Sequence, residues 1–308
     1  MLAGMLVLLV SPAHADTFGT GANTFTIGFV PIGNAGNAND TVNGAGTNYG
    51  AVPYNFNMST FAISQDQIAK ARASGAGVPL GGGAWVGSQP VANVSWYQAA
   101  AFVNYLNTST GHAKAYNLDA GATSLTLWTP SDAGYDASNL YRNSNAFYVL
   151  PSENEYYKAA YYDPNKVGGA GYWLYATGSD TIPTAVVSGT GAGTAVYNSL
   201  SAQPAAVDQS GGLSPYGTMG QNGNVYELLE SARDGVNDVS SENRAMRGGG
   251  FNNPEGAMRS SFRNFTAPTS TVTSIGYRVA SVPEPSCTVL LFGTGMMWLA
   301  RRRRGLSH

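Results

Sequence analysis

Residues 244–280 read RAMRGGGFNNPEGAMRSSFRNFTAPTSTVTSIGYRVA, an arginine–glycine segment on which the interpretation of the whole chain depends. The consecutive glycines at 248–250 allow a close backbone approach or a positive φ, where a side chain would clash. Arginines scattered among glycines and small polar residues are typical of guanidinium groups that bind backbone carbonyls and carboxylates. We therefore expect a structural arginine network, followed by a short strand at 275–279. Its members are Arg244, Arg247, Arg259, Arg263 and Arg278.

The composition favours one loop-rich extracellular domain. Only 11% of the 308 residues are charged, and 39 are glycine. Without the four tail arginines and Glu284, 12 Lys and Arg stand against 17 Asp and Glu, a net charge of −5. Because no basic face for a phosphate backbone is evident, nucleic-acid binding is not expected. The single cysteine, Cys287, excludes an intramolecular disulfide, and no repeat or long linker divides the chain before residue 281.

The N-terminal segment 1–15 has the pattern of a secretory signal peptide. An apolar run at 2–10 is followed by Pro12 and then by Ala13-His14-Ala15, which fits an A-x-A cleavage site. The usual positive n-region is absent. We expect export, with a mature chain that begins near Asp16.

The C-terminal segment 282–308 combines three features in a fixed order: Pro283-Glu284-Pro285, an apolar run at 287–300, and four arginines at 301–304. The apolar run is shorter than the roughly 20 residues that span a bilayer, and the arginines favour a cytoplasmic end. This order resembles PEP-CTERM sorting signals. The resemblance implies a Gram-negative bacterium, transient insertion into the inner membrane, cleavage by an exosortase-type enzyme, and delivery to the cell surface or extracellular matrix. An ordinary C-terminal anchor is the alternative.

Local patterns predict the regular elements between these ends. Alternating residues at 24–32 and 52–63 predict strands, as does a short run at 147–150. Ser64, Ser95 and Ser152 are N-cap residues that predict helices at 65–73, from residue 96 onward, and from 153 to about 161. Ser152 and Glu155 form a capping box. The turn at 220–227 enters a short strand or helix.

Two loops contain candidate binding residues. The run 33–40 is rich in turn formers, and its oxygens suit either an Asx-turn loop or a calcium ion; the residues are Asn34, Asn37, Asn39 and Asp40. In the loop 163–180, Tyr172, Trp173 and Tyr175 either line a cleft or cover the core. His112 is a lone histidine on a loop, which favours a solvated side chain over a ligand.

Four motifs in order resemble the formylglycine-generating enzyme (sulfatase-modifying factor) family. They are PVANVSWYQA at 90–99, VLPSENEYY at 149–157, GNVYEL at 223–228, and the arginine–glycine segment. By resemblance, the fold is a single loop-rich α+β domain over residues 16–281, related to C-type lectins.

The active enzymes of this family oxidise a substrate cysteine with two active-site cysteines that hold copper(I), a metal that soft thiolates suit. The resemblance places the two cysteine positions at Asn253 and Met258, and neither is a thiol. Copper-dependent oxidation is therefore not expected. A second branch binds iron through three histidines, but His14, His112 and His308 lie in the signal segment, in a loop and at the last position.

The family also binds calcium at the GNVYEL turn. By resemblance, Gly223 and Val225 supply carbonyl oxygens and Glu227 a carboxylate, but a further ligand position is occupied by Gly220. Loss of one hard oxygen ligand weakens such a site. The alternative is that Glu227 pairs with one of the arginines of the segment.

These observations predict a non-catalytic family member that binds a polypeptide or glycan. Its expected cleft residues are Trp173, Tyr175, Arg259 and Arg263. One alternative is a metal-assisted oxidoreductase of unfamiliar chemistry, with Glu227, Asn253 and Arg259 in polar roles. A purely structural matrix protein is a third hypothesis.

Overall fold

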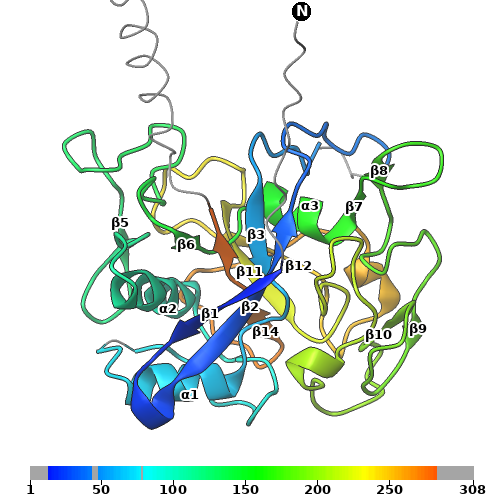
Figure 1. Ribbon diagram of the computed structural model, residues 1–308, viewed down its shortest axis with the longest axis horizontal. Helices are drawn as coiled ribbons and strands as arrows, with labels where there is room; N and C mark the ends of the chain where they lie inside the picture. Colours follow the sequence, from blue (N-terminus) through cyan, green and yellow to red (C-terminus); the bar gives the residue numbers. More distant parts are fainter. Residues whose placement is uncertain (1–12, 44–47, 78, 283–308) are drawn as a thin grey trace, which may run out of the picture.

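The computed structural model describes residues 13–43, 48–77 and 79–282 (Figure 1). The predicted sorting tail beyond Val282 and most of the predicted signal segment lie outside the described residues. Within the described ranges, no helix has the length and apolar character needed to cross a membrane.

The first sheet has five antiparallel strands in the order β1-β2-β3-β15-β6. Its strands are β1 (His14–Phe18), β2 (Phe25–Ile32), β3 (Phe56–Ser59), β15 (Ala280–Ser281) and β6 (Tyr148–Val149). Because β1 begins at His14, the predicted cleavage after Ala15 falls within this strand of the full chain. The last described strand lies inside the sheet, between β3 and β6.

The strand prediction at 52–63 was too long, since β3 covers only 56–59 and its pairing can begin only where β2 ends. Ile32 ends β2 and pairs with Phe56, which begins β3. Just beyond Ile32, Asn34 turns the chain with a φ of 58°. The prediction at 24–32 was correct to one residue. Of the expected strand at 275–279, only residues 275–277 form a strand, β14; Arg278 and Val279 link it to β15 in the first sheet.

The second sheet has four strands in the order β13-β12-β11-β14. They are β11 (Tyr226–Ala232), β12 (Arg244–Arg247), β13 (Asn264–Thr266) and β14 (Ile275–Tyr277). The pair β11–β14 is parallel, whereas β11–β12 and β12–β13 are antiparallel. The turn at 220–227 therefore leads into a strand, and the arginine–glycine segment supplies the other three strands of this sheet.

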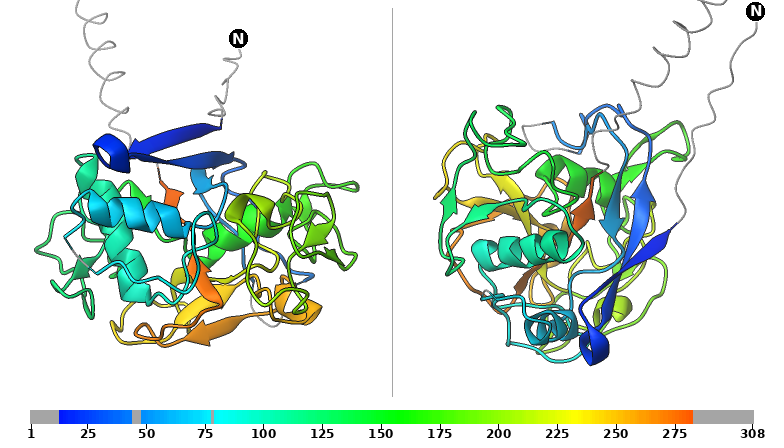
Figure 2. Two further views of the ribbon diagram at one scale, coloured as in Figure 1. Left: turned by 90° about the horizontal axis from the view of Figure 1, so that it is seen from below. Right: turned by 60° about the vertical axis from the view of Figure 1, so that its left-hand side comes forward.

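All three predicted helices form, and each begins with a capping box. They are α1 (Gln65–Ala73), α2 (Trp96–Ser109) and α3 (Glu153–Tyr161). The hydroxyls of Ser64, Ser95 and Ser152 accept the backbone N–H of the residue three positions later, which satisfies a donor that the first turn leaves free. Figure 2 (left) shows the β1–β2 hairpin lying over α1 and α2.

Short elements complete the chain, as expected for a loop-rich domain. Three two-stranded pairs are β4 (Asn117–Leu118) with β5 (Leu125–Thr126), β7 (Tyr162–Asp163) with β8 (Gly171–Tyr172), and β9 (Thr184–Ala185) with β10 (Thr194–Ala195). Three 3-10 turns are η1 (Gly21–Asn23), η2 (Val207–Gln209) and η3 (Glu255–Met258). One apolar core runs from Phe18 to Ala280 and so joins the two sheets. At its centre, the indole N–H of Trp96 on α2 donates to the carbonyl of Leu229 on β11, at 2.9 Å.

Candidate functional site

The expected arginine network is present in the structure. Arg247 donates from Nε to Glu153 at 2.7 Å, and its Nη1 reaches the carbonyls of Ser260 and Phe262 at 2.7 and 3.0 Å. Arg263 donates to both oxygens of the same carboxylate, from Nε at 2.7 and 2.8 Å and from Nη2 at 2.6 Å. Glu153 stands in the first turn of α3, so one buried carboxylate ties this helix to both ends of the glycine-rich loop.

Arg278 forms a second, fully buried pair with Glu227. The two side chains meet through two hydrogen bonds, at 2.5 and 2.8 Å, and both residues have 0% exposure. The remaining Arg278 donors reach the carbonyls of Ser59 and Met219, each at 2.8 Å. Burial raises the pKa of Glu227, and the facing guanidinium opposes that rise. The alternative prediction that Glu227 pairs with an arginine is confirmed.

A third group includes residues that the sequence did not single out. Arg142 binds Glu230 at 2.7 Å and Glu155 at 3.0 Å. Burial alone would raise the pKa of Glu155, but Arg142 and the capping hydrogen bond lower it. Arg142 lies in an irregular stretch, and Glu155 was noted only as part of a capping box. No local pattern therefore predicted that these two side chains form an ion pair. Arg244 donates to the carbonyls of Glu242 and Ser240, the latter at 2.9 Å. It also stacks over the rings of Trp96 and Tyr141, at 4.5 and 4.1 Å.

The glycine run permits a close approach, as predicted. Gly248 has a φ of +94°, and a Cβ there would lie 2.6 Å from the hydroxyl of Tyr156 on α3. Gly249 also has a positive φ. The loop therefore passes against α3 more closely than any larger residue would allow.

The two positions that the resemblance equates with catalytic cysteines differ in their surroundings. Met258 has 0% exposure and packs with Tyr175, Ala195 and Tyr197. Asn253 is half-buried, and its Oδ1 accepts the Gly250 N–H at 2.9 Å, which closes the turn that follows the glycines. Together they offer one amide oxygen held by the backbone and one neutral thioether enclosed by aromatic rings, whereas copper(I) prefers several soft sulfur donors.

The four expected cleft residues are only partly brought together. Exposed Arg259 donates from Nε to the hydroxyl of buried Tyr175, at 3.2 Å. Arg263 is half-buried in its pair with Glu153. Trp173 donates to Asp163 at 3.1 Å, and the amine of Lys166 lies 4.0 Å from the centre of its ring. Both interpretations of the aromatic loop hold in part: Tyr175 and Tyr172 belong to core clusters, and Tyr172 also lines a pocket.

The GNVYEL turn makes several protein contacts. Gly223 donates its N–H to the carbonyl of Gly248 at 2.7 Å, and Val225 is buried directly before β11. Both carboxylate oxygens of Glu227 are hydrogen-bonded to Arg278. Among the described residues, no group of three or more His, Cys, Asp or Glu side chains is placed to hold a metal ion. Calcium at Gly223, Val225 and Glu227 stays a prediction.

The loop at 33–40 takes the Asx-turn form. Asp40 accepts the N–H groups of Val42 and Asn43 at 2.9 and 3.0 Å, and its other oxygen accepts the hydroxyl of Tyr157 at 2.8 Å. Asn39 and Asn37 accept backbone N–H groups at 51 and 52. Elsewhere, His112 lies on a loop, is half-buried and stacks on Phe147, with ring centres 4.9 Å apart, so its side chain is only partly solvated.

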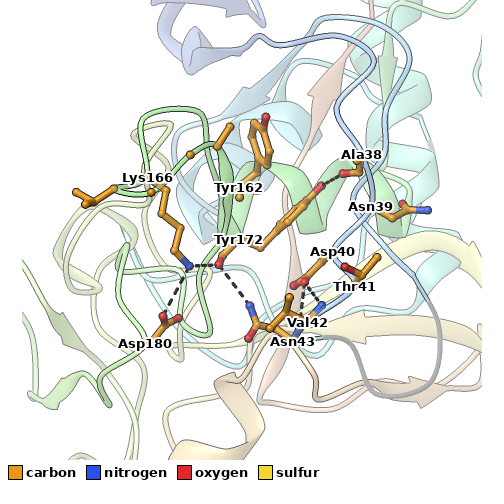
Figure 3. A pocket seen from close by; sticks show the side chains of 15 residues that line it. Ala38, Asn39, Asp40, Thr41, Val42, Asn43, Tyr162, Lys166, Tyr172 and Asp180 are labelled. Carbon is orange, nitrogen blue, oxygen red and sulfur yellow. Dashed lines mark hydrogen bonds and ion pairs between the residues drawn. The ribbon is translucent and has the colours of Figure 1, made fainter.

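A pocket of about 460 Å³ lies between this loop and the β7–β8 hairpin (Figure 3). Residues 38–43 form one wall, and Tyr162, Tyr172 and residues 166–171 form the other. The hydroxyl of Tyr172 donates to the carbonyl of Ala38 at 2.8 Å and so joins the two walls. Lys166 lies 3.6 Å from Asp180 at the open side. The sequence marked Asp40 and Tyr172 separately but gave no sign that their loops meet.

The five-stranded and four-stranded sheets, the three capped helices and the buried arginine–carboxylate pairs define a loop-rich α+β domain. Residues 27–282 match the family model described as the sulfatase-modifying factor enzyme 1-like domain, so the chain belongs to this family. No curated protein matches the chain.

Several solved structures share the fold, among them three that cover most of the chain. The variable protein 1 of Treponema denticola has 18% identity and a TM-score of 0.58, with coverage of 87% of this chain and 99% of its own. CarF has 20% identity and a TM-score of 0.58, with coverage of 83% and 98%. PvdO from Pseudomonas aeruginosa has 16% identity and a TM-score of 0.51, with coverage of 88% and 92%. At these identities the likeness shows the fold alone.

Proposed function

We propose that this protein is an exported binding member of its family, at the cell surface or in the extracellular matrix, without copper-dependent cysteine oxidase activity. The proposal rests on the two residues that stand where, by resemblance, the active enzymes of the family have cysteines. Asn253 directs its oxygen to a backbone N–H, and Met258 is enclosed by Tyr175 and Tyr197. Copper(I) needs more than one soft sulfur donor for tight binding, and this pair supplies only one neutral thioether, so these two side chains would not retain it tightly.

The test is incubation of the purified protein with copper(I) and a cysteine-containing peptide. Mass spectrometry then follows the loss of thiol and the gain of aldehyde, while a chelator competes for the metal. We expect no aldehyde and no copper retained against the chelator. The control is the double variant Asn253→Cys with Met258→Cys, which should retain copper because it restores two soft donors. Aldehyde formation by the unmodified protein would show the proposal to be wrong.

The ligand of this module is a polypeptide or a glycan. Exposed Arg259 beside the hydroxyl of Tyr175 offers polar contacts on the glycine-loop side, and the pocket between residues 38–43 and the β7–β8 hairpin offers a concave site. The alternative, a metal-assisted oxidoreductase, would use Glu227, Asn253 and Arg259. Glu227 and Asn253 are already bonded to Arg278 and Gly250, which favours binding over catalysis.

Export rests on the two terminal segments, 1–15 and 282–308, and on processing by an exosortase-type enzyme after transient insertion of residues 287–300. By resemblance, the fold is also related to C-type lectins, a relation that suits ligand binding by loops. Mass spectrometry of the protein from its own host should find a mature start near Asp16 and a C-terminus near 283–285. Recovery of the intact chain from the cytoplasm would contradict export.

A further inference from the structure

We propose that the pocket between residues 38–43 and the β7–β8 hairpin binds an uncharged sugar unit of a polysaccharide. This inference rests on the proposed binding function and deepens it, since it names one site and one chemical class of ligand. The site differs from the expected cleft, because neither Arg259 nor Arg263 lines the pocket.

The size and lining of the pocket suit a small polar ligand with one apolar face. Its volume of about 460 Å³ lies in the range of ligand sites. Val42 and Val167 stand at its rim with 87% and 96% of their surfaces exposed, and two tyrosine rings lie deeper. A sugar ring has C–H faces that pack on such groups and hydroxyls at its edge that bind polar ones.

Charges in the pocket are already compensated, which favours an uncharged ligand. Both oxygens of buried Asp40 are hydrogen-bonded, one to the N–H groups of Val42 and Asn43 and the other to a tyrosine hydroxyl. Lys166 faces Asp180 and also donates to the carbonyl of Tyr172. An anion would have to separate Lys166 from Asp180, and a cation would meet the ammonium group at the same place.

The pocket is poorly suited to an extended peptide. A peptide that adds to a strand needs free backbone groups along that strand. The carbonyl of Tyr172 on β8 is already occupied, because Lys166 donates to it from one side and the amide of Asn43 from the other, at 3.3 Å for Asn43 (Figure 3). Side chains therefore occupy this backbone acceptor, and recognition depends on separate polar groups.

Separate polar groups are present at the pocket. Within the part of the chain that the structure describes, the hydroxyl of Thr41 and the Oδ1 of Asn43 have no hydrogen-bond partner. Asp180 is 57% exposed and can accept a hydroxyl without leaving Lys166. One hydroxyl, one amide oxygen and one carboxylate form the set of donors and acceptors that sugar hydroxyls bind.

The test compares two full-length variants that add an indole to an exposed alanine. Ala170→Trp fills the pocket, whereas Ala137→Trp makes the same change on a loop outside it. The probes are immobilised neutral hexose oligosaccharides, their uronic-acid counterparts, and a library of unstructured peptides. We expect saturable binding of neutral oligosaccharides, weakened at least about tenfold by Ala170→Trp and unchanged by Ala137→Trp. Thr41→Ala should weaken the same binding, and Thr41→Ser should restore it.

Four outcomes would overturn the inference. If Ala170→Trp binds the neutral oligosaccharide as tightly as the unmodified protein does, the glycan site lies elsewhere. Tighter binding of uronic acids, or no binding of neutral sugars, would show that the ligand class is wrong. Loss of peptide binding in Ala170→Trp would also show that the ligand class is wrong. None of these results resembles failure of the proposed function, which would be seen as aldehyde formation from a cysteine peptide.

Discussion

Single arginines hold together segments that are distant in the sequence. Arg278 binds a carboxylate on β11, the carbonyl of Ser59 at the end of β3 and the carbonyl of Met219 in a loop, and every partner is buried. Replacing one member of such a set leaves the other charge without a partner in a site that excludes water, and this costs far more than the pair itself contributes.

We predict that Arg278→Met lowers the free energy of unfolding by about 3–5 kcal/mol, because Glu227 and two carbonyls lose their donors. Arg259→Met is the matched control, since its guanidinium is exposed, and it should cost less than about 1 kcal/mol. Denaturant unfolding of both variants measures the difference. Equal, small losses would mean that the buried pair does not hold the two sheets together.

At the scale of elements, the helices were predictable from the sequence because their signals are local. Ser95 and Gln98 lie within one turn and make both capping bonds, at 3.0 and 3.2 Å. Strand ends were less predictable, since Phe56 begins β3 only where β2 supplies a partner. The meeting of Arg142 with Glu230, and of the two pocket walls, depends on contacts across the whole chain, which no spacing within one segment encodes.

The cap of α2 gives a prediction at this scale. Ser95→Ala removes the acceptor for the Gln98 N–H and should destabilise the protein by about 1 kcal/mol. Ser109→Ala, at the exposed far end of the same helix, is the control and should have a smaller effect. Thermal unfolding compares the two variants. If Ser109→Ala lowers the stability as much as Ser95→Ala does, the effect would come from helix propensity and not from the cap.

At the scale of the whole molecule, tyrosine is a main component of the core. The chain has 18 tyrosines, and burial raises the pKa of both Tyr141 and Tyr161 to about 12. In the unfolded chain these groups ionise near pH 10. Above that pH the unfolded state releases protons that the folded state keeps, so stability falls as the pH rises.

We therefore predict that the free energy of unfolding decreases above about pH 10, by up to about 1.4 kcal/mol per pH unit for each such tyrosine. Denaturant unfolding at a series of alkaline pH values measures the slope, and absorbance of tyrosinate should rise together with unfolding. Tyr161→Phe should make the slope shallower. Tyrosinate absorbance that rises near pH 10 while the protein remains folded would contradict the assignment.

The place of β15 has a consequence for how the molecule is made. A ribosome delivers β1, β2, β3 and β6 long before residues 280–281, yet those two residues join β3 to β6 in the interior of the sheet. Until they emerge, β3 and β6 have no shared neighbour, and the nascent polypeptide cannot close its first layer. Completion of the fold therefore waits until residues 280 and 281 have left the ribosome, and a chain that stops short of residue 280 would present open strand edges to chaperones and proteases.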